Sequence, residues 1–173
     1  MRNVLTFFFL ANIALGLISL VVLPAEVAIH FGLGGEADGW ASRETNALLF
    51  MGIAVPLFLA LLYGPLLTMK INPRYMNIPN KDYWLREENR PVFAQKLRSL
   101  TWEFGASIFV FLGFIQVLTI HANLLDPVRI NETVLFVALG LLMAYSAWWC
   151  FRFYRDFRIP KSEESFPNPN TQK

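Results

Sequence analysis

The sequence predicts an all-α integral membrane protein, a bundle of four transmembrane helices with both termini in the cytoplasm. Three observations support this class: an apolar composition, four long uncharged stretches and a one-sided distribution of Lys and Arg. Of the 173 residues, 55% are hydrophobic and 15% are aromatic, and the mean hydropathy is +0.41. These values are too high for an ordinary soluble domain of this length, so the chain is expected in a membrane.

Four stretches are apolar over the length of helix that a bilayer requires, which is about 20 residues. They are residues 4–23, 47–69, 105–125 and 133–151. We interpret the first as an uncleaved span, because no small-residue cleavage pattern follows Leu23. Residues 1–160 are therefore predicted to form a single transmembrane domain. The polar tail 161–173, rich in Pro and Asn, is expected to be a disordered cytoplasmic extension.

The orientation follows from the basic residues, which are retained on the cytoplasmic side of short loops. With the N-terminus inside, every Lys and Arg except Arg43 and Arg129 falls on the cytoplasmic side. Both termini are therefore expected in the cytoplasm, and residues 23–40 form an outer loop. The net charge of only +2 gives no general attraction to nucleic acid, so none is expected as a partner.

The cytoplasmic segment between the second and third spans changes character along its length. Pro73 and Pro79 make its first half irregular. From about Arg86, apolar residues recur at helical spacing, which predicts an amphipathic helix that runs into the third span and lies along the inner leaflet. A soluble partner that covers this apolar face is the alternative.

Three spans carry small or polar residues on one face, which is typical of helix packing in lipid. These faces are Asn12, Gly16 and Ser19 in the first span, Gln116, Thr119 and Asn123 in the third, and Gly140, Ala144 and Ala147 in the fourth. A bundle interface is the simpler interpretation, and a substrate path is the alternative. No span interior holds a carboxylate, Lys or Arg, which argues against an ion-coupled transporter.

The outer loop has the most distinctive polar pattern in the chain. Residues 26–31 alternate between apolar and polar side chains, which predicts a short extended segment at the membrane surface. The dipeptide Asp38-Gly39 is typical of a tight turn, and Trp40 is suited to the membrane interface. The candidate binding residues are His30, Phe31, Glu36, Asp38, Gly39 and Trp40.

A metal ion held by His30, Asp38 and His121 is an alternative use of this loop, since the predicted topology places both histidines at the outer face. No compact ligand pattern such as His-Glu-x-x-His supports it. In the simpler interpretation, Asp38 stabilises the turn and His30 bonds to the backbone or to lipid headgroups.

The outer loop and the spans beside it resemble a bacterial membrane domain of unknown function, DUF1648, which also forms the N-terminal part of SdpI-type immunity proteins. The resemblance covers about residues 4–67 and depends on Leu23, Pro24, His30, Phe31, Gly35, Asp38, Gly39 and Trp40. A later stretch, Met76–Leu85, is similar to a motif of short members of this group, here Asn77, Pro79, Asn80, Tyr83 and Trp84. The resemblance implies a multi-pass protein of the bacterial inner membrane with an immunity-like or signalling accessory role.

No nucleophile elbow, phosphate-binding loop, dinucleotide fingerprint or Cys-x-x-Cys is present in the sequence, so no enzyme and no cofactor is predicted. We expect a non-enzymatic envelope protein that binds a peptide, a lipid or a partner protein through residues 23–40. A passive transport or channel subunit, built as a homo-oligomer, is the alternative, followed by a metal-dependent membrane enzyme. The expected partners are the lipid bilayer and a membrane or envelope protein.

Overall fold

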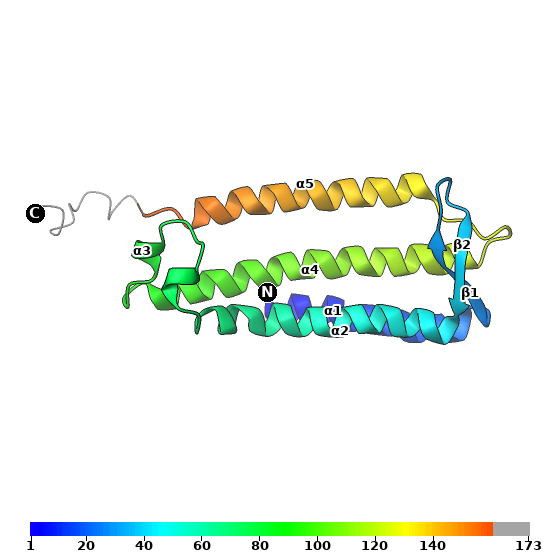
Figure 1. The fold of residues 1–173 in the computed structure, drawn as a ribbon, viewed down its shortest axis with the longest axis horizontal. Coiled ribbons are helices and arrows are strands. Elements are labelled where there is room, and N and C mark those ends of the chain that lie inside the picture. The colour runs from blue at the N-terminus through cyan, green and yellow to red at the C-terminus, as the bar shows by residue number, and fades with distance from the viewer. Residues whose placement is uncertain (161–173) are drawn as a thin grey trace, which may run out of the picture.

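The structure is a computed structural model, and it describes residues 1–160. Four long helices lie alongside one another, with a two-stranded sheet at one end and a short helix at the other (Figure 1). The elements in order are α1 (Arg2–Val22), β1 (Glu26–Phe31), β2 (Ala37–Ser42), α2 (Arg43–Thr68), η1 (Pro73–Tyr75), α3 (Lys81–Trp84), α4 (Arg90–Asn123) and α5 (Glu132–Asp156). We refer to the two ends as the hairpin end and the α3 end.

The helices α1, α2, α4 and α5 are long and apolar enough to cross a membrane. The four predicted spans are therefore confirmed, and the chain is a multi-pass membrane protein. The class is mostly helical rather than all-α, because β1 and β2 pair as an antiparallel sheet. The predicted disorder of the tail concerns residues 161–173, which lie outside the described part of the chain.

The predicted amphipathic helix forms the first turns of α4, which is one continuous helix of 34 residues. We expected its apolar face to lie along the inner leaflet, but part of that face packs within the protein instead. Phe93 and Leu100 are buried in a cluster with Trp84 and Phe157 at the α3 end. This cluster covers the face that the sequence left open to lipid or to a soluble partner.

The core of the bundle is formed by α1, α2 and α4, around Leu5, Ala54 and Phe109. Asn12 lies buried between α1 and α4, where its Nδ2 donates to the carbonyl oxygens of Phe8 and Phe109, each at 2.8 Å. Its Oδ1 accepts from Nε2 of Gln116, also at 2.8 Å. The polar faces predicted for the first and third spans are therefore confirmed as a helix interface.

Helix α5 packs chiefly against α4 and has no buried residue. Figure 1 shows it at the side of the bundle, away from α1 and α2. Gly140, Ala144 and Ala147 are exposed, and no atom lies within 4 Å of the position that a side chain at Gly140 would take. The predicted interface on this face is therefore wrong for the single chain. An apolar groove of about 300 Å³ separates the middle of α5 from α4.

The segment that resembles a family motif holds the end of α5. Asn80 Nδ2 and Trp84 Nε1 both donate to the carbonyl oxygen of Phe157, each at 2.8 Å. Lys96 Nζ donates to the adjacent carbonyl of Asp156, also at 2.8 Å. The last carbonyls of a helix have no partner within the helix, so these donors cap α5. Of the other motif residues, Tyr83 is buried, Pro79 is half-buried and Asn77 is exposed.

Candidate binding site at the hairpin end

The hairpin is fastened to the bundle through buried polar contacts. Asn123, at the end of α4, bonds to both the N–H and the C=O of Ala28 in β1. Arg43 Nη1 donates to the carbonyl of Leu23 at 3.1 Å, across the base of the hairpin. Because Val27 and Ala28 are both fully buried, β1 lies directly on the helix ends.

The predicted alternation along β1 is only partly right, because the strand pairing shifts register between Ala28 and His30. As a result Val27 and Ala28 are both buried, whereas Ile29 is exposed. Irregularities of this kind, in which one strand contributes an extra residue, break the simple two-residue period.

The turn of the hairpin lies at residues 32–36, where the N–H of Gly32 donates to the carbonyl of Glu36 at 2.9 Å. Gly34 and Gly35 adopt φ values of +90° and +78°, which side chains disfavour. The predicted turn at Asp38-Gly39 is therefore corrected, because both residues are part of β2.

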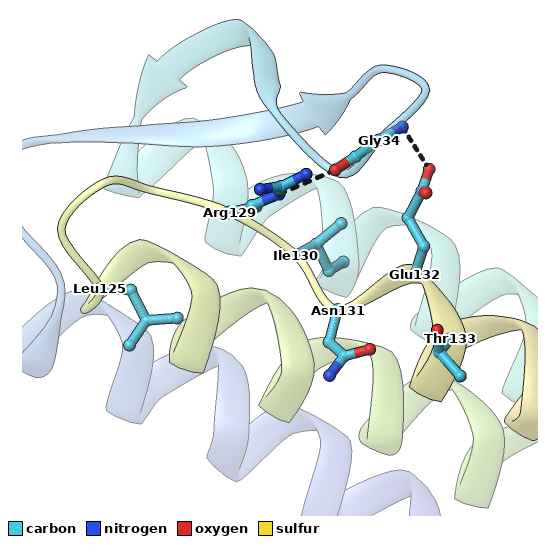
Figure 2. A pocket seen from close by; sticks show the side chains of 7 residues that line it. All are labelled: Gly34, Leu125, Arg129, Ile130, Asn131, Glu132 and Thr133. Atoms are coloured by element: carbon cyan, nitrogen blue, oxygen red, sulfur yellow. Dashed lines mark hydrogen bonds between the residues drawn. The ribbon is translucent and has the colours of Figure 1, made fainter.

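The tip of the hairpin is held by the loop between α4 and α5 (Figure 2). Arg129 Nε donates to the carbonyl of Gly34 at 2.8 Å, and the N–H of Gly34 donates to Oε1 of Glu132 at 2.9 Å. The N–H of Ile130 donates to the carbonyl of Gly35 at 2.8 Å. A Cβ at Gly35 would lie 2.3 Å from the Ile130 carbonyl oxygen, so this approach requires glycine.

Two hollows flank Arg129. The first, the Glu132 hollow, has a volume of about 390 Å³ and is drawn in Figure 2. The second, which we call the Trp40 hollow, has a volume of about 400 Å³. Its lining residues are Glu36, Ala37, Trp40, Asp126, Pro127, Val128 and Arg129. It therefore combines an indole ring with two carboxylates and one guanidinium.

The structure divides the predicted binding residues among three places. Glu36 and Trp40 line the Trp40 hollow. His30 Nδ1 and Asp38 Oδ1 lie 2.5 Å apart and pair with each other across the strands, with both side chains largely exposed. Gly39 lies opposite His30 in the sheet, and an added Cβ there would be 2.8 Å from Cβ of His30. Phe31 packs instead on a buried cluster with Leu118 and Ile130 beneath the hairpin.

The predicted metal ligands do not gather into one set. Within residues 1–160, no group of three or more His, Cys, Asp or Glu side chains is placed to hold a metal ion. His30 and Asp38 contact each other, but His121 does not complete a three-ligand group with them. The pair has a simpler role, which is to link β1 to β2 on the exposed face of the hairpin.

Three charged residues in or just after the loop between α4 and α5 were not predicted from the sequence, namely Asp126, Arg129 and Glu132. One signal was available, because Arg129 is one of only two basic residues outside the set predicted to be cytoplasmic. Acidic residues outnumber Arg at the hairpin end. The acids are Glu26, Glu36, Asp38, Glu44, Asp126 and Glu132, against Arg43 and Arg129.

Arg43 and Arg129 already have partners within the protein. Arg43 pairs with Glu44 at 3.1 Å, and Nε of Arg129 is bonded to Gly34. Glu36 and Asp126 have exposed side chains and form no ion pair within the described residues. A hydrogen bond to a carbonyl leaves the charge of Arg129 in place, but six acids against two Arg still give this end a net negative formal charge.

These features define a multi-pass helical membrane protein with a β-hairpin cap tied across the ends of its helices. Residues 7–55 match the family described as Domain of unknown function (DUF1648). The chain thus carries a DUF1648 domain, which comprises most of α1, the whole hairpin and the first half of α2. No curated protein and no solved structure matches the chain.

Proposed function

We propose that this protein is a non-enzymatic binding protein of the bacterial cytoplasmic membrane, and that its hairpin end recognises a positively charged segment of a peptide or partner protein. The Trp40 hollow is the observation that carries the proposal. It places the carboxylates of Glu36 and Asp126 beside an exposed indole ring. A Lys or Arg side chain is attracted both to carboxylates and to the face of an indole.

The anchoring of the hairpin supports a binding role. Asn123 fixes its base and Arg129 fixes its tip, so both walls of the Trp40 hollow are held before a ligand arrives. Binding to a preformed surface loses less conformational entropy than binding that must order a loop.

The distribution of Lys and Arg supports the orientation on which this function depends. The basic residues gather at the α3 end, which the positive-inside rule assigns to the cytoplasm. The hairpin end would then face the cell exterior or the periplasm, where a secreted peptide or an envelope protein is available.

The channel alternative has less support. Gln116, Thr119 and Asn123 are buried in the bundle and bonded within it, so they do not line an open path through a single chain. A metal-dependent enzyme would need a donor set that residues 1–160 do not bring together. We therefore retain binding through the hairpin end as the proposed function.

The proposal is tested by titrating the protein in nanodiscs with a short lysine-containing peptide and with its glutamine- and glutamate-substituted counterparts. We expect binding of the lysine peptide alone, and a Kd raised about tenfold by Glu36→Gln with Asp126→Asn, equivalent to about 1.4 kcal/mol. Trp40→Ala is expected to act in the same direction, because it removes the ring.

The matched control is Glu87→Gln with Glu88→Gln, which removes two exposed carboxylates at the α3 end. It should leave peptide affinity unchanged. Equal binding of all three peptides, or equal loss in the control and the Trp40 hollow variants, would refute the proposed function.

A further inference from the structure

A second polar hollow lies at the α3 end, between the start of α1 and the first half of α4. It has a volume of about 400 Å³ and is lined by Met1, Gln95, Arg98, Ser99 and Trp102. We call it the Arg98 pocket. Arg98, Ser99 and Trp102 lie three, four and seven positions after Gln95, so the four residues share one face of α4. No acidic residue lines it.

Two hydrogen-bond donors in the Arg98 pocket lack acceptors. Arg98 is half-buried, and its guanidinium forms no hydrogen bond or ion pair with any residue from 1 to 160. Nε1 of Trp102 is buried and also has no partner within that range. A donor that is buried without an acceptor is destabilising, and more so when it is charged.

The other Lys and Arg residues of α4 are bonded, which sets Arg98 apart on this helix. Arg90 Nη2 donates to the carbonyl of Met69 at 2.8 Å, and Lys96 Nζ donates to that of Asp156. The start of α1 adds positive potential, since its N-cap Met1 provides no side-chain acceptor for the free N–H groups of the first turn. The pocket therefore presents several donors and uncompensated positive charge.

We propose that the Arg98 pocket binds the phosphate-bearing headgroup of an anionic lipid in the leaflet at the α3 end. Arg98, Ser99 and Gln95 supply donors that suit phosphate oxygens. Trp102 lies one helical turn deeper, where it packs on the apolar cluster of Leu5 and Phe109. Indole rings favour the membrane interface, where the ester oxygens of a lipid can accept a hydrogen bond. The site is separate from the Trp40 hollow.

The test uses the protein in nanodiscs of phosphatidylcholine, with and without phosphatidylglycerol, analysed by native mass spectrometry. We expect retained phosphatidylglycerol on the wild type and about tenfold weaker retention in Arg98→Gln. Trp102→Phe, which keeps the ring but lacks the N–H, is expected to weaken retention by a smaller factor. The control is Arg74→Gln. It removes an exposed guanidinium at the same end, and this guanidinium has no partner among the described residues.

Thermal unfolding of each variant shows whether it is folded. If Arg98→Gln does not fold, lipid retention in Trp102→Phe tests the site instead. Titration with inorganic phosphate distinguishes a lipid headgroup from free phosphate. Displacement of the lipid by millimolar phosphate, or phosphate binding in nanodiscs of phosphatidylcholine alone, would overturn the lipid assignment. Equal retention in Arg98→Gln and Arg74→Gln would overturn the site itself.

Discussion

The side-chain amide of Asn123 in α4 forms two hydrogen bonds with Ala28 of β1. Its Oδ1 accepts from the Ala28 N–H at 2.7 Å, and its Nδ2 donates to the Ala28 carbonyl at 3.0 Å. The amide thus takes the place of a neighbouring strand along this edge of the hairpin. Because Ala28 is fully buried, no water is available to replace Asn123.

Replacement Asn123→Leu keeps a side chain of similar size but leaves both backbone groups of Ala28 without partners. Each buried unsatisfied group costs about 1–3 kcal/mol, so we expect the free energy of unfolding to fall by about 2–4 kcal/mol. Hydrogen exchange measured by mass spectrometry should accelerate in residues 26–31. His121→Ala, an exposed change on the same helix turn, should leave this exchange as it is. Unchanged protection in Asn123→Leu would contradict the anchoring role.

The two neighbouring glycines of the hairpin turn provide a matched pair of variants. Gly34 and Gly35 both have positive φ, so an alanine at either position costs about 1–2 kcal/mol in backbone strain. Only Gly35→Ala adds a steric clash, with the carbonyl of Ile130, whereas the nearest atom to a Cβ at Gly34 is 3.9 Å away. Thermal unfolding in detergent should therefore show a larger loss for Gly35→Ala. Equal losses of stability would show that the hairpin tip is not held against the loop between α4 and α5.

Asn80 and Trp84 donate to the same carbonyl, which predicts non-additive effects on stability. Trp84→Phe or Asn80→Ala alone leaves the Phe157 oxygen with one donor, and each hydrogen bond is expected to contribute about 0.5–1.5 kcal/mol. The double variant removes both donors and should lose more than the sum of the single losses. A double-mutant cycle from denaturant titrations measures this difference. Strict additivity would argue against a shared acceptor.

An ion pair between α4 and α5 supports a further prediction. Arg152 contacts Glu103 and Asp156, and the hydroxyl of Tyr145 donates to Glu103 at 3.3 Å. Glu103→Gln is expected to destabilise the protein by about 1–3 kcal/mol, because the part-buried guanidinium loses a charged acceptor. A spin label on Cys150, the single cysteine, should become more mobile in this variant.

The double variant Glu103→Gln with Arg152→Gln removes both charges. It should recover part of the lost stability, since no uncompensated charge remains near this interface. A double variant less stable than Glu103→Gln alone would indicate that Arg152 acts mainly through Asp156 or through its stacking on the ring of Trp148.

The four spans could be predicted because an apolar stretch long enough to cross a bilayer is recognised from consecutive residues alone. The α1–α4 interface was also predictable, since polar residues such as Asn12 and Gln116 need partners in lipid. The same reasoning failed for Gly140, because small residues permit a close approach but do not require one. The sequence alone does not show which of several helix faces with small residues packs against another helix.

The proposed binding site was predicted in part from the sequence. Glu36 and Trp40 were identified, but Asp126 and Arg129 reach them from a distant loop, and only the fold brings the two loops together. The predicted position of the turn was wrong for the same reason, because residues of the distant loop hold the actual turn. Asp38-Gly39 is locally suited to a turn, whereas the positive-φ backbone of Gly34 and Gly35 is held by hydrogen bonds from Arg129 and Ile130.

Helix α5 is attached to the rest of the protein at both ends and has no buried residue between them. Glu132 is joined to the hairpin tip at one extremity, and Phe157 is joined to Asn80 and Trp84 at the other. Between Glu132 and Tyr145, the first residue of α5 that contacts Glu103, the sequence is therefore constrained more by its length than by its composition. Exchange of one apolar residue for another would be tolerated there, but one inserted residue would turn the far attachment by about 100° and shift it by about 1.5 Å.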